Sequence, residues 1–332
     1  MPEQRPTVLL TRSDVAELLG FPACIGAVER AFRQNAEGKI GPAGILATHV
    51  EGGSFHIKTA ALVGAACYFA AKTNANFPGN PKAHGLPTIQ GAILLFDAAN
   101  GCLLAVMDSA EVTALRTGAT TAVAAKYLAK QSAATLTLVG CGTQAVAQLG
   151  AVATVRQLRR VFVADIDPAR AARFAEQYGK ALGIELEPVS DLRKALSGSD
   201  MCITCTPSRK FIVDAEWVPP GCFVAAVGAD SESKQEIDPA LFISASVVVD
   251  SLEQCASIGD LHHAIDAGAI TRNDVHAELG EVIAGRKAGR QSETETILFD
   301  SSGVALGDVA AAAVVYEGAI KASRGAPVNL MN

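Results

Sequence analysis

Residues 135–145 read Thr-Leu-Thr-Leu-Val-Gly-Cys-Gly-Thr-Gln-Ala, and this stretch decides the fold. A short apolar run, typical of a β-strand, ends in Gly140-x-Gly142-x-x-Ala145, and a helical pattern of apolar residues follows. A second apolar run, residues 161–164, ends in Asp165. Strand, glycine turn, helix, strand and acid in this order predict a βαβ unit that binds a dinucleotide.

Each position of this stretch suits one part of such a ligand. Gly140 allows the tight turn, and Gly142 lets the backbone approach a pyrophosphate. Ala145, where a third glycine often stands, keeps the helix close to the strand. The N–H groups at the helix start would face the phosphates, and Asp165 can accept hydrogen bonds from the adenosine ribose. An ordinary strand–helix turn is the alternative, but it does not explain the ordered set.

Composition narrows the class of protein. The 332 residues are enough for two domains. With 49% hydrophobic and 19% charged residues, the chain resembles a well-packed enzyme rather than a disordered protein. The net charge of -6 and the lack of a basic run argue against nucleic acid or an anionic membrane as a partner.

The first six residues lack the basic-then-apolar layout of a signal peptide. The longest apolar stretch, residues 60–71, is too short to span a bilayer. We therefore expect a cytoplasmic protein with no membrane partner.

The eight cysteines are scattered among apolar neighbours, as expected of small buried side chains in a reducing compartment. Cys202-x-x-Cys205 has redox or zinc spacing. It lies in a run that looks like a buried strand, and no second Cys/His pair accompanies it, so we expect no metal site.

The N-terminal third predicts an α+β unit. Thr11 would cap a first helix, and a second apolar-faced helix ends near residue 38. Five β-like runs follow, at residues 44–50, 54–63, 67–74, 88–97 and 102–107. Asn100-Gly101 between the last two is a hairpin signal, so the sheet should be largely antiparallel.

The rest of the chain alternates β and α patterns. A helical run over residues 111–129 leads into the βαβ unit, and further β runs lie at residues 201–204, 223–227 and 247–249. This alternation predicts an α/β protein with a doubly wound parallel (Rossmann) sheet. We expect the apolar helix at residues 309–322 to return to the N-terminal unit. The predicted domains are 1–118 with 307–332 for substrate and dimerisation, and 119–306 for the dinucleotide.

Polar residues follow several of the parallel strands, where ligands of open α/β sheets bind. Thr206 and Ser208 follow one run, and Gly228 and Asp230 follow another. Each one alone could be only a loop cap, but their shared position favours a site. Asp230 would lie near the nicotinamide end of a dinucleotide.

Three cations precede the nucleotide-binding segment. Lys58 and Lys72 lie inside β runs, where a lysine is costly unless it is paired or functional, and strand alternation puts His56 on the same face as Lys58. Arg116 stands among small residues, and its guanidinium suits a carboxylate. The set suggests a small amino or imino acid; exposed, snorkelling side chains are the alternative.

Together these segments resemble the ornithine cyclodeaminase/μ-crystallin family over nearly the whole chain. The strings that carry the resemblance are 72–81 (KTNANFPGNP), 85–89 (GLPTI), 104–108 (LAVMD), 113–119 (TALRTGA), 140–145 (GCGTQA), 228–236 (GADSESKQE), 274–282 (DVHAELGEV) and 300–303 (DSSG). The resemblance implies a Rossmann domain, and a substrate domain that is completed by the C-terminal helix and forms homodimers through its sheets.

The resemblance also implies roles for individual residues. Lys72 matches the family's active-site lysine, Arg116 its substrate-carboxylate arginine, and Asp230 the carboxylate that handles the amine or imine proton. The positions matching cofactor contacts are Gly140, Gly142, Thr143, Gln144, Ala145, Asp165, Thr206, Ser208, Gly228 and Gly303.

The chain departs from the family pattern around the substrate. Ile45 stands where many members carry a basic residue, Lys58-Thr59 replaces a common Met-Pro pair, and His56 replaces Arg or Glu. We hypothesise that Lys58 supplies the missing positive charge from another strand, and we place His56 and Lys58 with Lys72 and Arg116 in the substrate site.

The expected activity is NAD(P)H-dependent reduction of a small 2-imino acid, such as the cyclic ketimine Δ1-pyrroline-2-carboxylate, to the L-amino acid. A cyclodeaminase with tightly bound NAD, an alanine dehydrogenase-like reductive amination and a non-catalytic μ-crystallin-like binding protein are the alternatives. Asp165 favours NAD(H), since a 2′-phosphate would meet its charge, and nearby Arg170 keeps NADP(H) possible. Ring size and higher oligomers are left open by the sequence.

Overall fold

The computed structural model describes residues 6–41, 43–64 and 67–330. Residues 1–5 and 65–66, which entered the predictions of location and of the longest apolar stretch, lie outside this range. The chain divides into unit 1, Met1–Arg116 with Ala305–Asn332, and unit 2, Thr117–Val304. The domain boundaries expected from the sequence, 118/119 and 306/307, stay a prediction.

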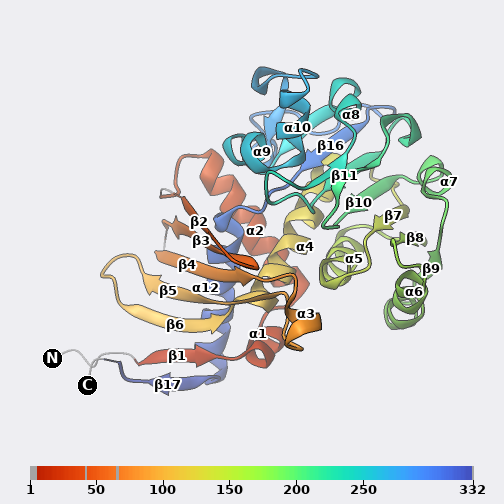
Figure 1. Ribbon diagram of the computed structural model, residues 1–332. Helices are drawn as coiled ribbons and strands as arrows, with labels where there is room; N and C mark the ends of the chain where they lie inside the picture. Colours follow the sequence, from red (N-terminus) through yellow and green to blue (C-terminus); the bar gives the residue numbers. More distant parts are fainter. Residues whose placement is uncertain (1–5, 42, 65–66, 331–332) are drawn as a thin grey trace. The chain divides into compact units, whose positions relative to one another are not determined.

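Unit 1 contains a seven-stranded sheet in the order β17-β1-β6-β5-β4-β3-β2 (Figure 1). Its strands are β1 (Thr7–Leu10), β2 (Gly44–Val50), β3 (Gly53–Leu62), β4 (Tyr68–Asn76), β5 (Ile89–Asp97), β6 (Leu103–Asp108) and β17 (Ala326–Val328). All neighbours run antiparallel except β1 and β6. The Asn100-Gly101 turn joins β5 to β6, with Gly101 at φ 77°, as its sequence predicts.

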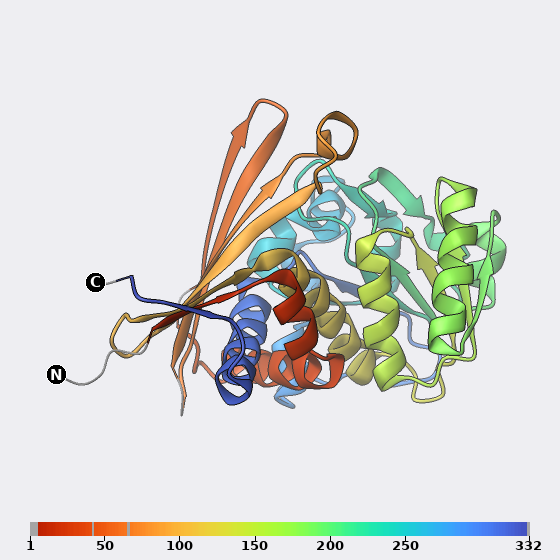
Figure 2. The same ribbon diagram turned by 90° about the horizontal axis from the view of Figure 1, so that it is seen from below.

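Helices cover one face of this sheet. They are α1 (Arg12–Leu18), α2 (Phe21–Ala36) and the C-terminal α12 (Ala305–Ala322); the short α3 (Asn80–Ala83) joins β4 to β5. Thr11 and Asp14 form the expected capping box of α1. The helix α12 packs on α2 and across β3 and β4, and Figure 2 shows it in blue beside the red α2 on the same face.

Unit 2 is built on an eight-stranded sheet in the order β15-β14-β16-β12-β10-β7-β8-β9, with every neighbouring pair parallel. Its strands are β7 (Thr135–Val139), β8 (Arg160–Ala164), β9 (Glu185–Pro188), β10 (Met201–Thr204), β12 (Phe223–Ala226), β14 (Ser246–Val249), β15 (Ala277–Glu278) and β16 (Ile297–Asp300). A small parallel pair, β11 (Arg209–Val213) and β13 (Gln235–Ile237), stands apart from it. This confirms the predicted doubly wound α/β fold.

The helices of unit 2 follow its strands. They are α5 (Thr143–Val155), α6 (Pro168–Leu182), α7 (Leu192–Ser197), α8 (Pro239–Ser244), α9 (Leu252–Ile258), α10 (Asp260–Asp266), α11 (Leu279–Ile283), and the larger part of α4 (Ser109–Leu128), whose first residues belong to unit 1. In the described ranges, none of the helices has the length and apolar character needed to cross a membrane.

The core of the parallel sheet consists of strands buried on both faces. Every residue of β10, β12 and β16 is buried, which explains their continuous apolar runs. Because all strands run in one direction, the loops after β7, β8, β10, β12 and β16 leave the same edge of the sheet, and these loops carry the residues predicted to bind a dinucleotide.

Candidate functional site

Three charged side chains meet inside unit 1. Lys72 on β4, Arg116 on α4 and Asp308 on α12 are 3%, 5% and 1% exposed. Lys72 Nζ lies 2.7 Å from Asp308 Oδ2, and Arg116 Nε lies 2.8 Å from Asp308 Oδ1. Such burial excludes the reading of Lys72 and Arg116 as solvated surface side chains. Two cations therefore share one carboxylate.

Packing brings Arg116 close to the start of α12. A Cβ atom on Gly307 would lie 3.1 Å from Arg116 Cδ, so this helix position leaves little room for a side chain. The adjacent Asp308 thereby reaches the guanidinium from its Nε side. The terminal N–H fork of Arg116 is the part of the group that suits a substrate carboxylate.

The electrostatics of this cluster oppose a charged lysine. Burial, followed by the charges of Arg116 and Lys58, lowers the pKa of Lys72 to about 7, although Asp308 attracts its proton. Burial also disfavours the Asp308 carboxylate, but the charges of Arg116 and Lys72 outweigh it and lower the pKa of Asp308. Asp308 is thus an anion, whereas Lys72 is poised to gain or lose a proton near neutrality.

Lys58 lies next to Lys72 in the sheet. It is directly opposite Lys72 on the β3–β4 ladder and directly opposite Ile45 on the β2–β3 ladder. Like charges opposite one another destabilise a sheet, and the negative charge of Asp308, which interacts with both lysines, opposes this effect. His56 lies two residues before Lys58 on β3, and its Nε2 atom is 2.9 Å from Ser54 Oγ.

The glycine loop of unit 2 has the geometry that a pyrophosphate requires. Gly140, directly after β7, has φ 94°, and a Cβ atom there would lie 2.9 Å from Thr206 Cγ2. Gly142 begins α5 without a side-chain cap, and a Cβ atom there would meet nothing within 4 Å. The N–H groups of the first turn, at Thr143 and Gln144, can therefore be approached from that open side.

The helix α5 lies close to the body of unit 2. Ala145 is fully buried, and a Cβ atom on Gly118 of α4 would lie 2.4 Å from the carbonyl oxygen of Ala147. The helices α4 and α5 are therefore closely packed at this point. The role predicted for Ala145, which is to keep the helix close to the strand, stays a prediction.

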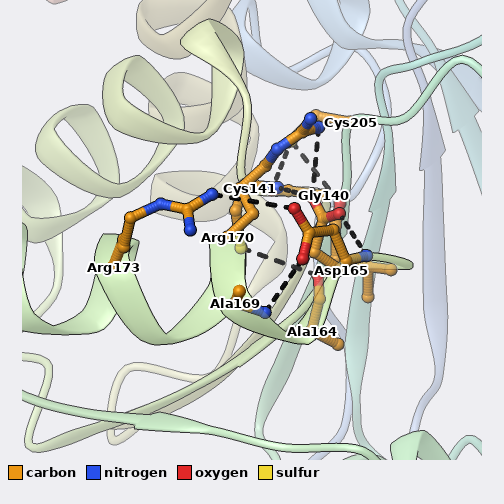
Figure 3. Close-up of polar contacts among 10 residues, drawn as sticks. Gly140, Cys141, Ala164, Asp165, Ala169, Arg170, Arg173 and Cys205 are labelled. Atoms are coloured by element: carbon orange, nitrogen blue, oxygen red, sulfur yellow. Dashed lines mark hydrogen bonds and ion pairs between the residues drawn. The ribbon is translucent and has the colours of Figure 1, made fainter.

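Asp165 lies at the end of β8 beside the glycine loop (Figure 3). Its Oδ2 atom accepts a hydrogen bond from Cys141 N at 2.8 Å, and Oδ1 accepts one from Asp167 N at 2.9 Å. Arg170 of α6 has an exposed side chain, and its Nη1 atom lies 3.9 Å from Asp165 Oδ2. The carboxylate thus supports the loop backbone. Its side chain is only 6% exposed, and its contact with a ribose hydroxyl stays a prediction.

The other predicted cofactor residues lie in loops after neighbouring strands. Thr206 and Ser208 follow β10, Gly228 follows β12, and Gly303 follows β16. The N–H of Gly303 donates to Asp250 Oδ2 at 2.8 Å, and its φ is 81°. Asp230 lies two residues beyond Gly228; its side chain is 50% exposed and forms an ion pair with Lys234 Nζ at 2.6 Å. Their roles in binding and catalysis stay predictions.

Two carboxylates were missed from the sequence. Asp308 was not predicted as a site residue. The signal that could have indicated it is a lone acid, between Gly307 and Val309, in an otherwise apolar helix. Glu236 closes the string GADSESKQE but had no role assigned; it is fully buried in β13. In the residues that the structure describes, no group of three or more His, Cys, Asp or Glu side chains could hold a metal ion.

The parallel sheet, the glycine loop and the acid after β8 define a dinucleotide-binding domain, and the proteins that this chain resembles are NAD-dependent oxidoreductases. The profile of the ornithine cyclodeaminase/mu-crystallin family matches residues 5–323. The chain belongs to this family, which confirms the resemblance read from its motifs.

Solved structures agree along almost the whole chain. An archaeal alanine dehydrogenase dimer with bound NAD is 40% identical, with a TM-score of 0.92 over 98% of this chain and 99% of its own. The Δ1-pyrroline-2-carboxylate reductase of Thermococcus litoralis, in complex with NADH and L-proline, is 35% identical, with a TM-score of 0.92 over 97% and 100%. The iminosuccinate reductase of Paracoccus denitrificans, in complex with NAD+, is 32% identical, with a TM-score of 0.89 over 98% and 100%.

Proposed function

We propose that this protein reduces the C=N bond of a small 2-imino acid with NAD(P)H and yields the L-amino acid. The observation that carries the proposal is the buried pair of cations, Lys72 and Arg116, held by Asp308. A buried cationic site in a dinucleotide-dependent enzyme suits a small substrate with a carboxylate. The reductases and the dehydrogenase that resemble this chain act on compounds of this kind, as their names say.

The residues of unit 2 fit a dinucleotide. The open side of Gly142 and the uncapped start of α5 suit the pyrophosphate, and Asp165 suits the adenosine ribose. Thr206, Ser208, Gly228 and Gly303 would line the rest of the cofactor. When bound, NAD(P)H supplies the hydride for the C=N bond. We place NAD(H) first because of the Asp165 charge.

The chain's own groups then bind and orient the substrate. Arg116 offers its N–H fork to the carboxylate, and Lys72 adds a second positive contact. Asp308 holds both cations in place. Asp230 stabilises the iminium charge or exchanges a proton with the product amine.

Lys58 extends this site toward β3. Its place opposite Ile45 agrees with the hypothesis that it replaces the basic residue absent from β2. The positive charge of Lys58 contributes to the lowered pKa of Lys72. We therefore include Lys58 and His56 among the substrate-binding residues.

The first experiment measures NADH and then NADPH oxidation with three substrates: Δ1-pyrroline-2-carboxylate, pyruvate with ammonia, and oxaloacetate with ammonia. Turnover of the ring compound alone would establish a cyclic ketimine reductase. Turnover of a keto acid only with ammonia would instead favour the alanine dehydrogenase-like alternative. No oxidation, but ammonia release from ornithine or lysine without net cofactor use, would establish a cyclodeaminase and overturn the proposal; no turnover of any kind would leave the binding-protein alternative.

We further propose a cytoplasmic homodimer formed through the sheet of unit 1. The edge strand β2 carries apolar side chains that face solvent, with Leu46 59% and Ile45 48% exposed, and one solved relative is described as a dimer. Light scattering should give twice the 34.2 kDa of one chain, and Leu46→Asp should reduce that mass. A monomeric wild type would contradict this proposal.

A further inference from the structure

Glu236 connects two loops at the carboxyl edge of the parallel sheet. Its Oε1 atom accepts a hydrogen bond from Thr206 N at 2.6 Å. Its Oε2 atom accepts one from Gly228 N at 2.7 Å and another from Thr204 Oγ1 at 2.7 Å. One fully buried carboxylate thus binds the backbone of the loop after β10 and of the loop after β12.

The space around this carboxylate is tight. A Cβ atom on Gly228 would lie 2.5 Å from Glu236 Cδ and 2.3 Å from the carbonyl oxygen of Thr206. Only glycine fits at this point, so the two loops and the carboxyl group form one closely packed unit. A change in the Glu236 side chain would be transmitted directly to both loops.

The backbone of Glu236 is fixed as well. Asp260, the first residue of α10, accepts hydrogen bonds from Glu236 N at 2.7 Å and from Ile237 N at 2.9 Å through its Oδ1 atom. Asp260 is itself fully buried. Asp260 therefore fixes the backbone of Glu236, and the two loops fix its carboxylate, so the residue has little freedom to move.

We propose that Glu236 is the positioning residue of the dinucleotide site, and that its carboxylate sets the spacing of the Thr206 and Gly228 loops against which the cofactor is held. This rests on the dinucleotide site of the proposed function. Glu236 acts through these two backbone amides, because its oxygens are already taken up by them and by Thr204. Loss of either bond leaves a partly buried N–H without this acceptor and frees that loop.

The test is Glu236→Gln, which keeps the size of the side chain but has one acceptor end and one donor end. Its matched control is Glu278→Gln in the same unit. Glu278 is the last residue of the edge strand β15, and its Oε1 atom accepts a backbone hydrogen bond from Leu252 N at 2.8 Å. Both variants and the wild type are titrated with NADH by fluorescence. Amide hydrogen exchange is followed in peptides that contain Thr206 and Gly228.

Glu236→Gln should raise the Kd for NADH by about tenfold, which equals about 1.4 kcal/mol, and should speed amide exchange in at least one of the two loops. Glu278→Gln should change neither quantity. Equal NADH affinity in the two variants, or faster exchange with unchanged affinity, would overturn the proposal and leave Glu236 a purely structural group.

If Glu236→Gln does not fold, Thr204→Val removes only the hydroxyl donor and should give a smaller increase in the Kd for NADH. In the wild type, the amides of Thr206 and Gly228 should be protected from exchange; rapid exchange of both would overturn the proposal. NADH binding without turnover of any imine would refute the proposed reaction and leave the role of Glu236 standing. No NADH binding by the wild type would refute both.

Discussion

Lys72 Nζ lies 2.7 Å from Asp308 Oδ2, and both side chains are almost completely buried. Their positions in the chain are far apart, one on a strand of the N-terminal third and one on the last helix. A buried ion pair of this kind is expensive to form and more expensive to break, because the remaining charge has no solvent to replace its partner. Breaking this pair should therefore be costly for the fold.

Replacing Asp308 should reveal that cost. Asp308→Asn leaves Lys72 and Arg116 buried side by side without their carboxylate, so the free energy of unfolding should fall by about 3–5 kcal/mol. Chemical denaturation measures it. Glu111→Gln, which breaks the exposed pair with Arg12, is the control and should cost less than about 1 kcal/mol. A similar loss of unfolding free energy in both variants would refute the prediction that the buried carboxylate of Asp308 contributes more to stability than the carboxylate of the exposed pair.

Substrate use should weaken as the pH rises through the pKa of Lys72, which burial lowers to about 7. Below that pH the ammonium is charged and attracts the carboxylate; above it the neutral amine does not. We therefore expect kcat/KM, which reports the free enzyme, to fall above about pH 7. In Lys72→Arg the cation persists, so kcat/KM should be lower but should not show this decline. Parallel pH profiles would show that Lys72 does not titrate in this range.

Gly142 should be needed for the cofactor rather than for the fold. A Cβ atom there meets no protein atom within 4 Å, but it would occupy the side from which a pyrophosphate approaches. Gly142→Ala should raise the Kd for NADH at least about tenfold. The matched control is Gly20→Ala, at another extended, uncapped helix start, with unchanged NADH affinity. Thermal unfolding of the two variants should differ little; a selective loss of stability in Gly142→Ala would contradict this reading.

Arg170 should decide how well NADPH is accepted. Its guanidinium is exposed and lies 3.9 Å from Asp165 Oδ2, so it can offset the negative charge that a 2′-phosphate would meet. Arg170→Gln should raise the KM for NADPH about fivefold, as for one exposed ion pair of about 1 kcal/mol, and leave the KM for NADH nearly unchanged. Arg173→Gln, on the same helix but paired with Asp167, is the control. An equal effect on both cofactors would remove Arg170 from cofactor choice.

Lys58 should matter for the substrate and not for the cofactor. Because it stands opposite Lys72 on the neighbouring strand, Lys58→Met should raise the KM for a carboxylate substrate and leave the KM for NADH unchanged. The increase should be larger for a dicarboxylic imino acid, which offers a second negative charge. Lys39→Met, at an exposed pair with Glu37, is the control. An unchanged substrate KM would refute the hypothesis that Lys58 replaces the missing basic residue.

The sequence predicted the parts of the fold that depend on local patterns. The strand before Gly140, the capping box at Thr11 and the Asn100-Gly101 hairpin all depend on neighbours in the chain. By contrast β16, which lies inside the parallel sheet between β14 and β12, was missed. It has only four residues, follows a polar loop and forms no local pair, so its burial depends on strands distant in sequence.

The site shows the same division. Lys72, Arg116 and the glycine loop stand in recognisable strings, and their residue types alone suggested anion binding. Asp308 and Glu236 act on groups that are distant in the chain, through contacts that spacing along the chain does not encode. The acids that organise the site were therefore harder to predict than the cations and glycines that would touch the ligands.

The insertion of unit 2 within unit 1 has a consequence for biosynthesis. The nucleotide-binding segment Thr117–Val304 is one unbroken run, so its whole sequence is available before α12 is translated. Lys72 and Arg116 leave the ribosome much earlier than Asp308, and until that helix is added they have no buried carboxylate to neutralise them. A nascent chain can therefore complete the sequence of its cofactor-binding sheet first. A chain that ended before α12 would lack both the helix that packs on α2, β3 and β4 and the carboxylate that pairs with Lys72 and Arg116.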